Sequence, residues 1–255
     1  QLITDCDTSF TDAMIDRTNK TRTYFQYRGA NANLSPADFK LVKLPARILH
    51  VGYILLLDAL DLPDSQYGTV MARLLHDAQA IGIKTSIDVV SEDSDRYAKI
   101  VPPALRFTDY AIINEFEASR STGIKVRDAY GRFLVDRAYT ICECLLAMGV
   151  STWAVIHSRE GAVGVTSTGD RAARPALNIP REKIISTIGA GDAFASGCLY
   201  QAYLGHSLSD GLEAGIAAAS TSLFSFNASD GVLPAGELLA FYLRTTKELW
   251  HGFPD

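Results

Sequence analysis

The segment from residue 186 to residue 194, which reads STIGAGDAF, holds the residues whose spacing most clearly could support chemistry. Two glycines flank an alanine, an aspartate follows at once, and an apolar helical pattern begins there. Glycines let the backbone approach a ligand closely, and N–H groups at a helix N-terminus bind anions and stabilise negative charge that develops during a reaction. The chain has no Gly-Lys pair, which a Walker A motif needs, and Phe194 stands where a dinucleotide motif has its third glycine. The segment therefore predicts an anion site of another type.

Asp192 in this segment has two interpretations. The carboxylate could cap the helix, or it could act as a general base that the helix dipole keeps ionised and that faces a substrate hydroxyl. An alcohol that attacks a phosphoryl group would use both parts of the segment. Asp192 would take the proton, and the amides of Gly189, Ala190 and Gly191 would hold the phosphate.

The composition excludes several functional classes. Apolar residues make up 47% of the 255 residues, charged residues make up 21%, and the net charge is −5. We therefore expect no nucleic-acid partner, and the lack of basic runs and of long apolar stretches predicts no membrane partner. Four cysteines are too few and too scattered for a disulfide framework, which favours free thiols in a cytoplasmic protein.

The apolar pattern predicts an α/β fold. Apolar runs typical of buried parallel strands alternate with segments of helical period, so we expect a mainly parallel sheet with helices on both faces. The predicted strands span 47–53, 85–90, 110–114 and 153–157, and the predicted helices span 66–80, 132–148, 191–204, 208–225 and 235–249. Two β-prone runs, 11–17 and 21–27, predict a hairpin that precedes this body, and Ser35-Pro36-Ala37-Asp38 predicts a helix start.

Polar residues stand at or near the ends of the four predicted strands. These residues are Tyr53, Asp88, Asn114 and His157. Ligands of such sheets bind at the carboxyl ends of the strands, so we expect these side chains on one rim, although a polar residue at a rim can also simply be solvated.

The longer segment STIGAGDAFASG resembles the signature of the ribokinase-like (PfkB) family of carbohydrate kinases, D-T-x-G-A-G-D-x-F-x-x-G. The matching residues are Thr187, Gly189, Ala190, Gly191, Asp192, Phe194 and Gly197. The run INEFEA resembles the N-x-x-E element of the family, and residues 24–36 are similar to the segment that leaves its lid. The resemblance covers essentially the whole chain and implies a ribokinase-like fold. Residues 1–33 would be part of a β lid and its exit, and residues 34–255 would be the kinase body.

The resemblance implies ATP-dependent phosphorylation of a hydroxyl of a small sugar or sugar acid. Asp192 would be the base, and the amides of Gly189, Ala190 and Gly191 would form the anion hole. Asn114 and Glu117 would organise Mg²⁺ through water near the ATP phosphates. Taken alone, Asn-x-x-Glu at a helix start is equally a capping box.

On the nucleotide side the resemblance implies contacts to ATP from two further loops. Thr187 of the signature and the turn with His157, Ser158 and Gly161 would lie there, although the usual T-x-G-x-x-G pattern has lost its first glycine to Ser158. A glycine at a tight turn between strands can be purely structural. The region of Asn227 and Gly231 resembles the segment that passes the adenine ring, and a plain turn explains it equally well.

For the sugar side, Arg28, Tyr53 and Asp88 are the candidate substrate residues. Arg28 could bind a sugar phosphate or shield an edge of the lid, and Asp88 could hold a water of Mg²⁺, contact phosphate or merely end its strand. The aromatic residues of the hairpin could close over the substrate. Lids of this family pair between subunits, so we expect a possible homodimer through the lid.

Two departures from the family pattern matter. Ser186 replaces the aspartate that opens the signature close to a monovalent-cation site of relatives, so activation by K⁺ is doubtful. Relatives also begin with a strand, further lid strands and a Gly-Gly element, and we expect that this sequence lacks that N-terminal portion.

Three other functions stay open at this stage. A nucleoside kinase belongs to the same class. A non-catalytic sensor of a sugar or nucleotide would not need the base. A nicotinamide oxidoreductase would need the dinucleotide fingerprint, which is missing.

Overall fold

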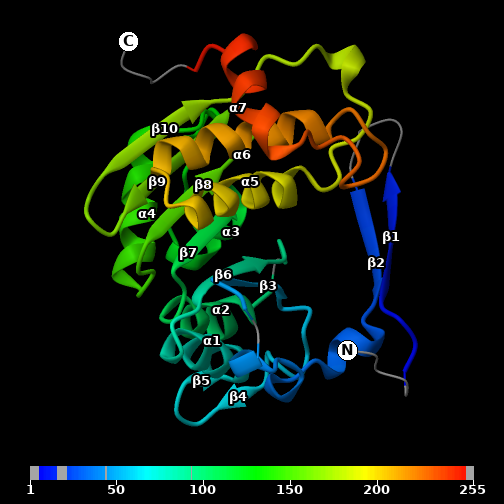
Figure 1. Cartoon of the computed structure of the whole chain (residues 1–255), viewed down its shortest axis with the longest axis vertical. Helices are drawn as coiled ribbons and strands as arrows, with labels where there is room; N and C mark the ends of the chain where they lie inside the picture. Colours follow the sequence, from blue (N-terminus) through cyan, green and yellow to red (C-terminus); the bar gives the residue numbers. More distant parts are fainter. Residues whose placement is uncertain (1–5, 16–21, 44, 93, 251–255) are drawn as a thin grey trace.

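A six-stranded central sheet with helices on both faces forms the body of the molecule (Figure 1). The computed structural model describes residues 6–15, 22–43, 45–92 and 94–250. The strand order is β10-β9-β8-β7-β6-β3, in which β3, β6, β7 and β8 are parallel and β9 and β10 are antiparallel additions. The bounds are β3 Ile48–Ile54, β6 Lys84–Val89, β7 Tyr110–Asn114, β8 Trp153–His157, β9 Gly161–Thr166 and β10 Arg171–Pro175. The predicted mainly parallel α/β fold is confirmed.

The four predicted strands are confirmed almost to the residue. Strands β7 and β8 are buried at every position except the last, because helices cover both faces of the sheet there. Their apolar runs are therefore continuous rather than alternating. Strands β9 and β10 are an addition that the sequence analysis did not predict.

The helices enclose two hydrophobic cores, one on each face of the sheet. One core contains residues of the first four helices, which are α1 Val70–Ala80, α2 Tyr97–Leu105, α3 Glu115–Thr122 and α4 Val135–Ala147. The other contains residues of the last three, which are α5 Ala190–Leu204, α6 Leu208–Ser222 and α7 Ala235–Arg244. Within the described ranges, no helix is both long and apolar enough to cross a bilayer.

Several predicted helix bounds need correction. The predicted helix 66–80 begins at Val70, because β4 (Pro63–Asp64) and β5 (Gly68–Thr69) form a small hairpin first and Thr69 then caps α1. The predicted helix 235–249 ends at Arg244. The start predicted at Ser35 has its capping box but yields only a three-residue 3₁₀ turn, Pro36–Asp38. Further 3₁₀ turns span Gly29–Asn33, Leu41–Lys43 and Arg181–Lys183.

The N-terminal hairpin stands apart from the central sheet. Strands β1 (Phe10–Ile15) and β2 (Arg22–Tyr27) form a separate antiparallel pair that runs along one side of the molecule (Figure 1). Both predicted runs are confirmed; residues 16–21 of the prediction lie outside the described residues. Aromatic side chains of the hairpin are exposed, with Phe25 at 56%. Its roles as a lid and as a dimer contact stay predictions.

The four cysteines are free thiols. Cys142 and Cys198 are buried, and Cys6 and Cys144 are half-buried. The expectation of free thiols is thus consistent with the structure.

A buried carboxylate ties the amino ends of three parallel strands together. Asp109, which is 2% exposed, accepts hydrogen bonds from the side chains of Lys84 at 2.6 Å, Gln79 at 2.8 Å and Ser151 at 2.8 Å and from the backbone N–H of Thr85 at 2.9 Å. Burial would raise the pKa of Asp109, but the hydrogen bonds that it accepts outweigh this effect and hold the pKa below its usual 3.8.

Both ends of α5 need a left-handed residue, but for different reasons. Gly189 is the N-cap with φ +78°, and a Cβ there would lie 2.7 Å from Cα of Ala228. Gly205 is the C-cap with φ +79°, and nothing lies within 4 Å of a Cβ built there. The glycine at 189 is therefore required by both conformation and space, whereas the glycine at 205 is required by conformation alone.

We expect Asp109→Asn to lower the free energy of unfolding by about 2–3 kcal/mol, because the buried acceptors of a charged network are lost. A group with a depressed folded-state pKa contributes stability above its unfolded pKa and loses it as the pH falls through the folded pKa, so the deficit should begin to shrink below about pH 4 and should vanish only below the folded-state pKa. Urea unfolding between pH 3 and pH 7 measures this difference. Asp77→Asn, at an exposed pair with His76, is the control and should change stability by less than about 0.5 kcal/mol.

We expect Gly189→Ala to destabilise the protein more than Gly205→Ala. The left-handed conformation costs an alanine about 1 kcal/mol at either position, and the contact with Ala228 adds about 1–3 kcal/mol at position 189 only. Urea unfolding of both variants measures the difference. An equal loss in the two variants would contradict the steric part of this explanation.

Candidate active site

The four polar residues predicted at the strand ends lie on adjacent parallel strands. Tyr53 is near the end of β3, Asp88 of β6, Asn114 of β7 and His157 of β8. Because these strands are neighbours in the order β8-β7-β6-β3, their carboxyl ends form one rim. The prediction of a common rim is confirmed.

The N-terminus of α5 lies against this rim at two points. The Tyr53 hydroxyl of β3 donates a hydrogen bond to Oδ1 of Asp192. The His157 ring of β8 packs on Phe194, with ring centroids 4.9 Å apart. A Cβ built on Gly191 would lie 3.5 Å from Cε1 of the same histidine. The first turn of α5 thus connects the two outer parallel strands of the rim.

The glycine segment has the backbone geometry of an anion site. The first intrahelical hydrogen bond runs from the N–H of Ala193 to the carbonyl of Gly189 at 2.8 Å. The N–H groups of Ala190, Gly191 and Asp192 precede this bond, so the helix gives them no internal acceptor. Together with the helix dipole, they can stabilise a negative ligand.

Asp192 is exposed, and its carboxylate accepts a hydrogen bond from Tyr53 rather than capping α5. The N-cap position belongs to Gly189, which has no side chain. In the described part of the chain Asp192 forms no ion pair with a cationic side chain. Burial and the hydrogen bond to Asp192 raise the pKa of Tyr53, so this tyrosine is a donor at neutral pH.

Buried carboxyl groups gather beside Asp192. Burial and, to a smaller extent, the nearby charges of Glu117 and Asp192 together raise the pKa of Asp88 to about 8. Burial and, to a smaller extent, the charge of Asp192 together raise the pKa of Glu117 to about 7. Glu117 is 4% exposed. A cluster of this kind favours a proton or a cation in its midst.

Asn114 and Glu117 form a capping box, as one of the two interpretations predicted. The Asn114 side chain accepts from the N–H of Glu117 at 2.9 Å, and Oε2 of Glu117 accepts from the N–H of Asn114 at 3.0 Å. The box uses only one carboxylate oxygen. The other, Oε1, accepts from the Ser91 hydroxyl at 2.8 Å and from the Asn114 amide at 2.5 Å. Capping and a role at the rim are therefore compatible.

A directly bound metal ion would need more ligands than this cluster offers. No group of three or more His, Cys, Asp and Glu side chains in the described ranges could hold one. The donor set of Asn114 and Glu117 instead fits a Mg²⁺ ion that keeps most of its water and takes further oxygens from a bound phosphate.

The predicted nucleotide turn is a tight hairpin between β8 and β9. The N–H of Ser158 donates to the carbonyl of Gly161 at 2.8 Å, and the Ser158 hydroxyl accepts from Glu160 at 3.2 Å. Gly161 has φ +153°, and a Cβ there would lie 2.9 Å from Cα of Pro175. The backbone conformation and the close contact with Pro175 are therefore sufficient to explain the glycine at position 161, which is the structural alternative that the sequence left open.

The Asn227–Gly231 segment is a turn, and it lies next to the glycine segment. Oδ1 of the Asn227 side chain accepts a hydrogen bond from the N–H of Asp230 at 2.8 Å, which closes the turn. Ala228 in its middle packs on Gly189. Gly231 approaches the end of α6, where a Cβ would lie 3.1 Å from Cα of Ser222. Thr187 lies nearby in sequence and is exposed.

Arg28 is not brought to the rim by any contact in the described residues. It forms an ion pair with Asp58, a residue that follows β3. This pair links the exit of the hairpin to the body.

Two residues of the site were missed by the sequence analysis. Ser91 follows β6, and its hydroxyl donates to Glu117. His50 lies on β3, with Nδ1 3.1 Å from the Ser86 hydroxyl of β6. The pairing of β6 with β3 brings His50 to Ser86, and the pairing of β6 with β7 brings Ser91 to Glu117, which follows β7. Proximity to Asp88 and Tyr53 is the only signal of these two residues in the sequence.

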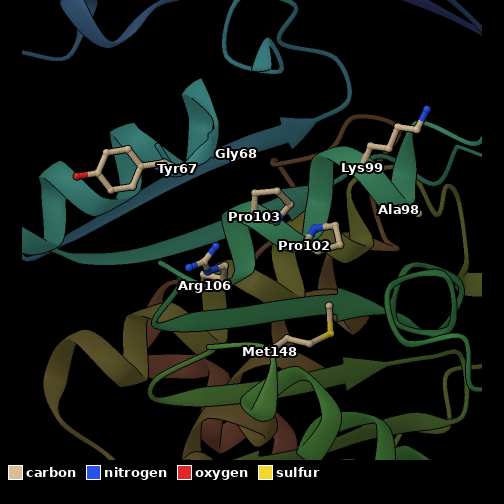
Figure 2. A pocket seen from close by; sticks show the side chains of 8 residues that line it. All are labelled: Tyr67, Gly68, Ala98, Lys99, Pro102, Pro103, Arg106 and Met148. Atoms are coloured by element: carbon tan, nitrogen blue, oxygen red, sulfur yellow. The ribbon is translucent and has the colours of Figure 1, made fainter. Parts of the chain in front are cut away.

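Two surface pockets lie away from the rim. Figure 2 shows one of about 360 Å³ along α2, lined by Tyr67, Gly68, Ala98, Lys99, Pro102, Pro103, Arg106 and Met148. The other, of about 400 Å³, is lined by residues 152–153, 166–168, 170–172 and 206–209. Neither contains a predicted site residue.

Comparisons with known proteins agree with this geometry. In sequence, 84 residues of this chain align with the 5-dehydro-2-deoxygluconokinase of Listeria monocytogenes serotype 4a (strain HCC23) at 34% identity. The alignment covers 33% of this chain and 25% of that protein. The corresponding protein of Listeria innocua serovar 6a is 33% identical over 33% of this chain and 25% of its own length. The chain thus matches about a quarter of the length of these curated relatives.

Solved structures share the fold. A ribokinase from Thermotoga maritima superposes with a TM-score of 0.68 at 20% identity, over 94% of this chain and 71% of its own. An adenosine kinase from Sinorhizobium meliloti also reaches 0.68, at 22% identity, over 91% and 64%. An Arabidopsis thaliana ribokinase in complex with ribose and ATP reaches 0.68 at 16% identity, over 93% and 70%. The model of the pfkB family carbohydrate kinases matches residues 1–235, and the chain therefore belongs to this family.

Proposed function

We propose that this protein transfers the γ-phosphoryl group of ATP to a hydroxyl group of a small sugar or sugar acid. The observation that carries the proposal is the position of Asp192, an exposed carboxylate beside the first-turn amides of α5 and at the carboxyl-end rim of the sheet. Membership of the family supports kinase chemistry. The 34% identity to a 5-dehydro-2-deoxygluconokinase over 84 residues favours a sugar acid among the acceptors.

In the proposed reaction Asp192 accepts the proton of the attacking hydroxyl. The hydrogen bond from Tyr53 holds the carboxylate at the rim and away from the amides of its own helix. The carboxylate therefore stays available to the acceptor. General bases of this kind contribute about 10²–10⁴-fold to the rate.

The amides of Gly189, Ala190 and Gly191 would bind the transferring phosphoryl group. These amides are fixed dipoles that point at the ligand, so they stabilise negative charge on the phosphoryl oxygens and need not reorganise during transfer. Phosphoryl transfer asks the protein mainly for alignment and charge stabilisation, and the glycine segment supplies both.

Glu117 and Asn114 would hold Mg²⁺ through water, and Asp88 would hold a further water or face the phosphate. When bound, Mg²⁺ neutralises charge on the ATP phosphates. The raised pKa values of Asp88 and Glu117 support this assignment, because they come from burial first and from neighbouring carboxylate charge second, and a cation would offset both.

The remaining ATP contacts would lie on the β8 side of the rim. Proximity to the glycine segment supports His157 and the loop around Asn227. Ser158, Gly161, Thr187 and Gly231 belong to the same proposal on the resemblance alone. On the acceptor side, Tyr53 and Asp88 are supported by their places beside Asp192, and Arg28 would have to leave Asp58 to reach a substrate.

We expect Asp192→Asn to lower turnover about 10²–10⁴-fold and to leave ATP binding within a few-fold of wild type, because the amide cannot accept the proton. The measurement is ATP consumption with ribose, 5-dehydro-2-deoxygluconate, adenosine and inosine. Asp136→Asn, at another exposed aspartate in the first turn of a helix, is the matched control and should keep full activity.

Three outcomes would contradict the proposed function. If Asp192→Asn kept more than a tenth of the wild-type turnover, Asp192 would not be the general base. Binding of an acceptor by the wild type without ATP consumption would identify a sensor instead, and turnover of the nucleosides alone would identify a nucleoside kinase.

We expect Glu117→Gln to raise the Mg²⁺ concentration needed for half-maximal activity by about tenfold, the size of effect seen when a group that orients metal ligands is lost. Glu115→Gln is the matched control. Glu115 lies in the same first turn of α3 but pairs with Arg127, so its Mg²⁺ requirement should be unchanged. Equal Mg²⁺ curves for the two variants would exclude Glu117 from the metal site.

A further inference from the structure

A small cluster of residues near Asp192 comes from two neighbouring strands. It consists of His50 and Gly52 of β3 and Ser86 and Asp88 of β6. His50 lies directly opposite Ser86 in the register of the two parallel strands. A Cβ built on Gly52 would lie 3.0 Å from Cβ of Asp88 and 3.8 Å from Nε2 of His50. The imidazole thus points along β3 toward the carboxyl end, and its Nε2 and Asp88 border the space that the glycine leaves free.

The Ser86 hydroxyl fixes the His50 ring and leaves Nε2 available. Nδ1 lies 3.1 Å from that hydroxyl, and Ser86 is fully buried. No contact of Nε2 with another polar side chain is found in the parts of the chain that the structure describes. His50 as a residue is partly exposed although protein atoms surround much of its ring, and Gly52 is exposed, so the space above the glycine is open to a ligand.

The two sides of the rim offer different contacts. The glycine segment of α5 meets β8 through Gly191 and His157, whereas the Asp192 carboxylate meets β3 through Tyr53. A phosphoryl group on the amides lies toward β8. The hydroxyl that attacks it must lie beside the carboxylate, toward β3, where His50 is.

We propose that His50 binds the acceptor substrate through a hydrogen bond between Nε2 and a neutral oxygen, a hydroxyl or carbonyl, in the space above Gly52. This inference rests on the proposed function, because it takes the molecule beside Asp192 to be the acceptor. It adds a specificity-determining residue on β3 that the motif does not contain.

The charge state of His50 supports a neutral partner. Burial by surrounding protein atoms lowers the pKa of His50 below 6.5, although the charge of Asp192 acts in the opposite direction. The charge of Asp192 acts on His50, and Asp88 borders the same space above Gly52. A neutral imidazole among carboxylates gives a hydrogen bond to an oxygen of the acceptor but no ion pair to a carboxylate.

The first test is kinetic and uses His50→Gln and His50→Ala with the panel of ribose, 5-dehydro-2-deoxygluconate, adenosine and inosine. Loss of one neutral hydrogen bond should raise the KM of the acceptor about three- to tenfold, with kcat within twofold and the KM of ATP unchanged. His76→Gln is the matched control, because His76 is exposed on α1 and contacts Asp77 and Tyr67 instead. Unchanged acceptor KM in both variants, or a rise in the KM of ATP alone, would overturn the inference.

The second test does not depend on turnover. The imidazole C–H signals of the wild-type protein are followed by NMR, and the signal that is missing in His50→Gln is that of His50. We expect saturating acceptor to shift this signal and to leave the His76 signal in place. A His50 signal that no compound of the panel moves would overturn the inference.

The two tests separate this inference from the proposed function. If no compound is phosphorylated but one of them shifts the His50 signal, the kinase assignment fails and the binding role of His50 stands. If a compound is phosphorylated while the His50 signal and the acceptor KM stay unchanged, the kinase assignment stands and the role of His50 fails.

Discussion

A carboxylate at the N-terminus of a helix is the constraint on which the site depends. The first-turn amides of α5 attract negative charge, so the Asp192 side chain would be drawn to them unless something held it elsewhere. The Tyr53 hydroxyl does this from β3. The left-handed Gly189 sets where the helix begins, and the contact with Ala228 leaves no room for a side chain there. In the proposed reaction, one helix start would thus have two opposite functions, with amides that bind an anion and a carboxylate that accepts a proton.

The electrostatic balance of the rim follows from this arrangement. Asp192 adds its charge to two buried carboxyl groups, and the pKa values of Asp88 and Glu117 rise to about 8 and about 7. Near neutral pH these groups therefore hold protons for part of the time. A cation that entered would displace those protons, whereas phosphate alone would meet repulsion. The site accepts an anion on its amides most readily when positive charge accompanies it, which is the form in which nucleotide triphosphates carry Mg²⁺.

The sequence was most informative where the determinants are local. The apolar runs predicted four parallel strands, most clearly at β7 and β8, where both faces of the strand are buried. Helix α2 escaped prediction because Pro102 and Pro103 lie inside it, and the burial of Val101 and Leu105 outweighs them. Strands β9 and β10 depend on pairing rather than on pattern. In the site, motif spacing placed Asp192 and the capping box, but Ser91 and His50 reach their partners only through the alignment of β6 with its neighbours.

The difference between local sequence motifs and contacts made by the folded chain also explains why the motif does not identify the substrate. Asp192 and the glycine amides would touch the reacting hydroxyl and the phosphoryl group, which are common to every alcohol acceptor. Discrimination between acceptors requires contacts to the rest of the molecule, because a site rejects an analogue by leaving its own polar groups unpaired. Such groups lie on β3, in His50 and Tyr53, and in the N-terminal hairpin, none of which the signature includes. Under the proposed function, catalysis and selectivity would thus depend on different elements, and only the catalytic element has a sequence pattern of its own.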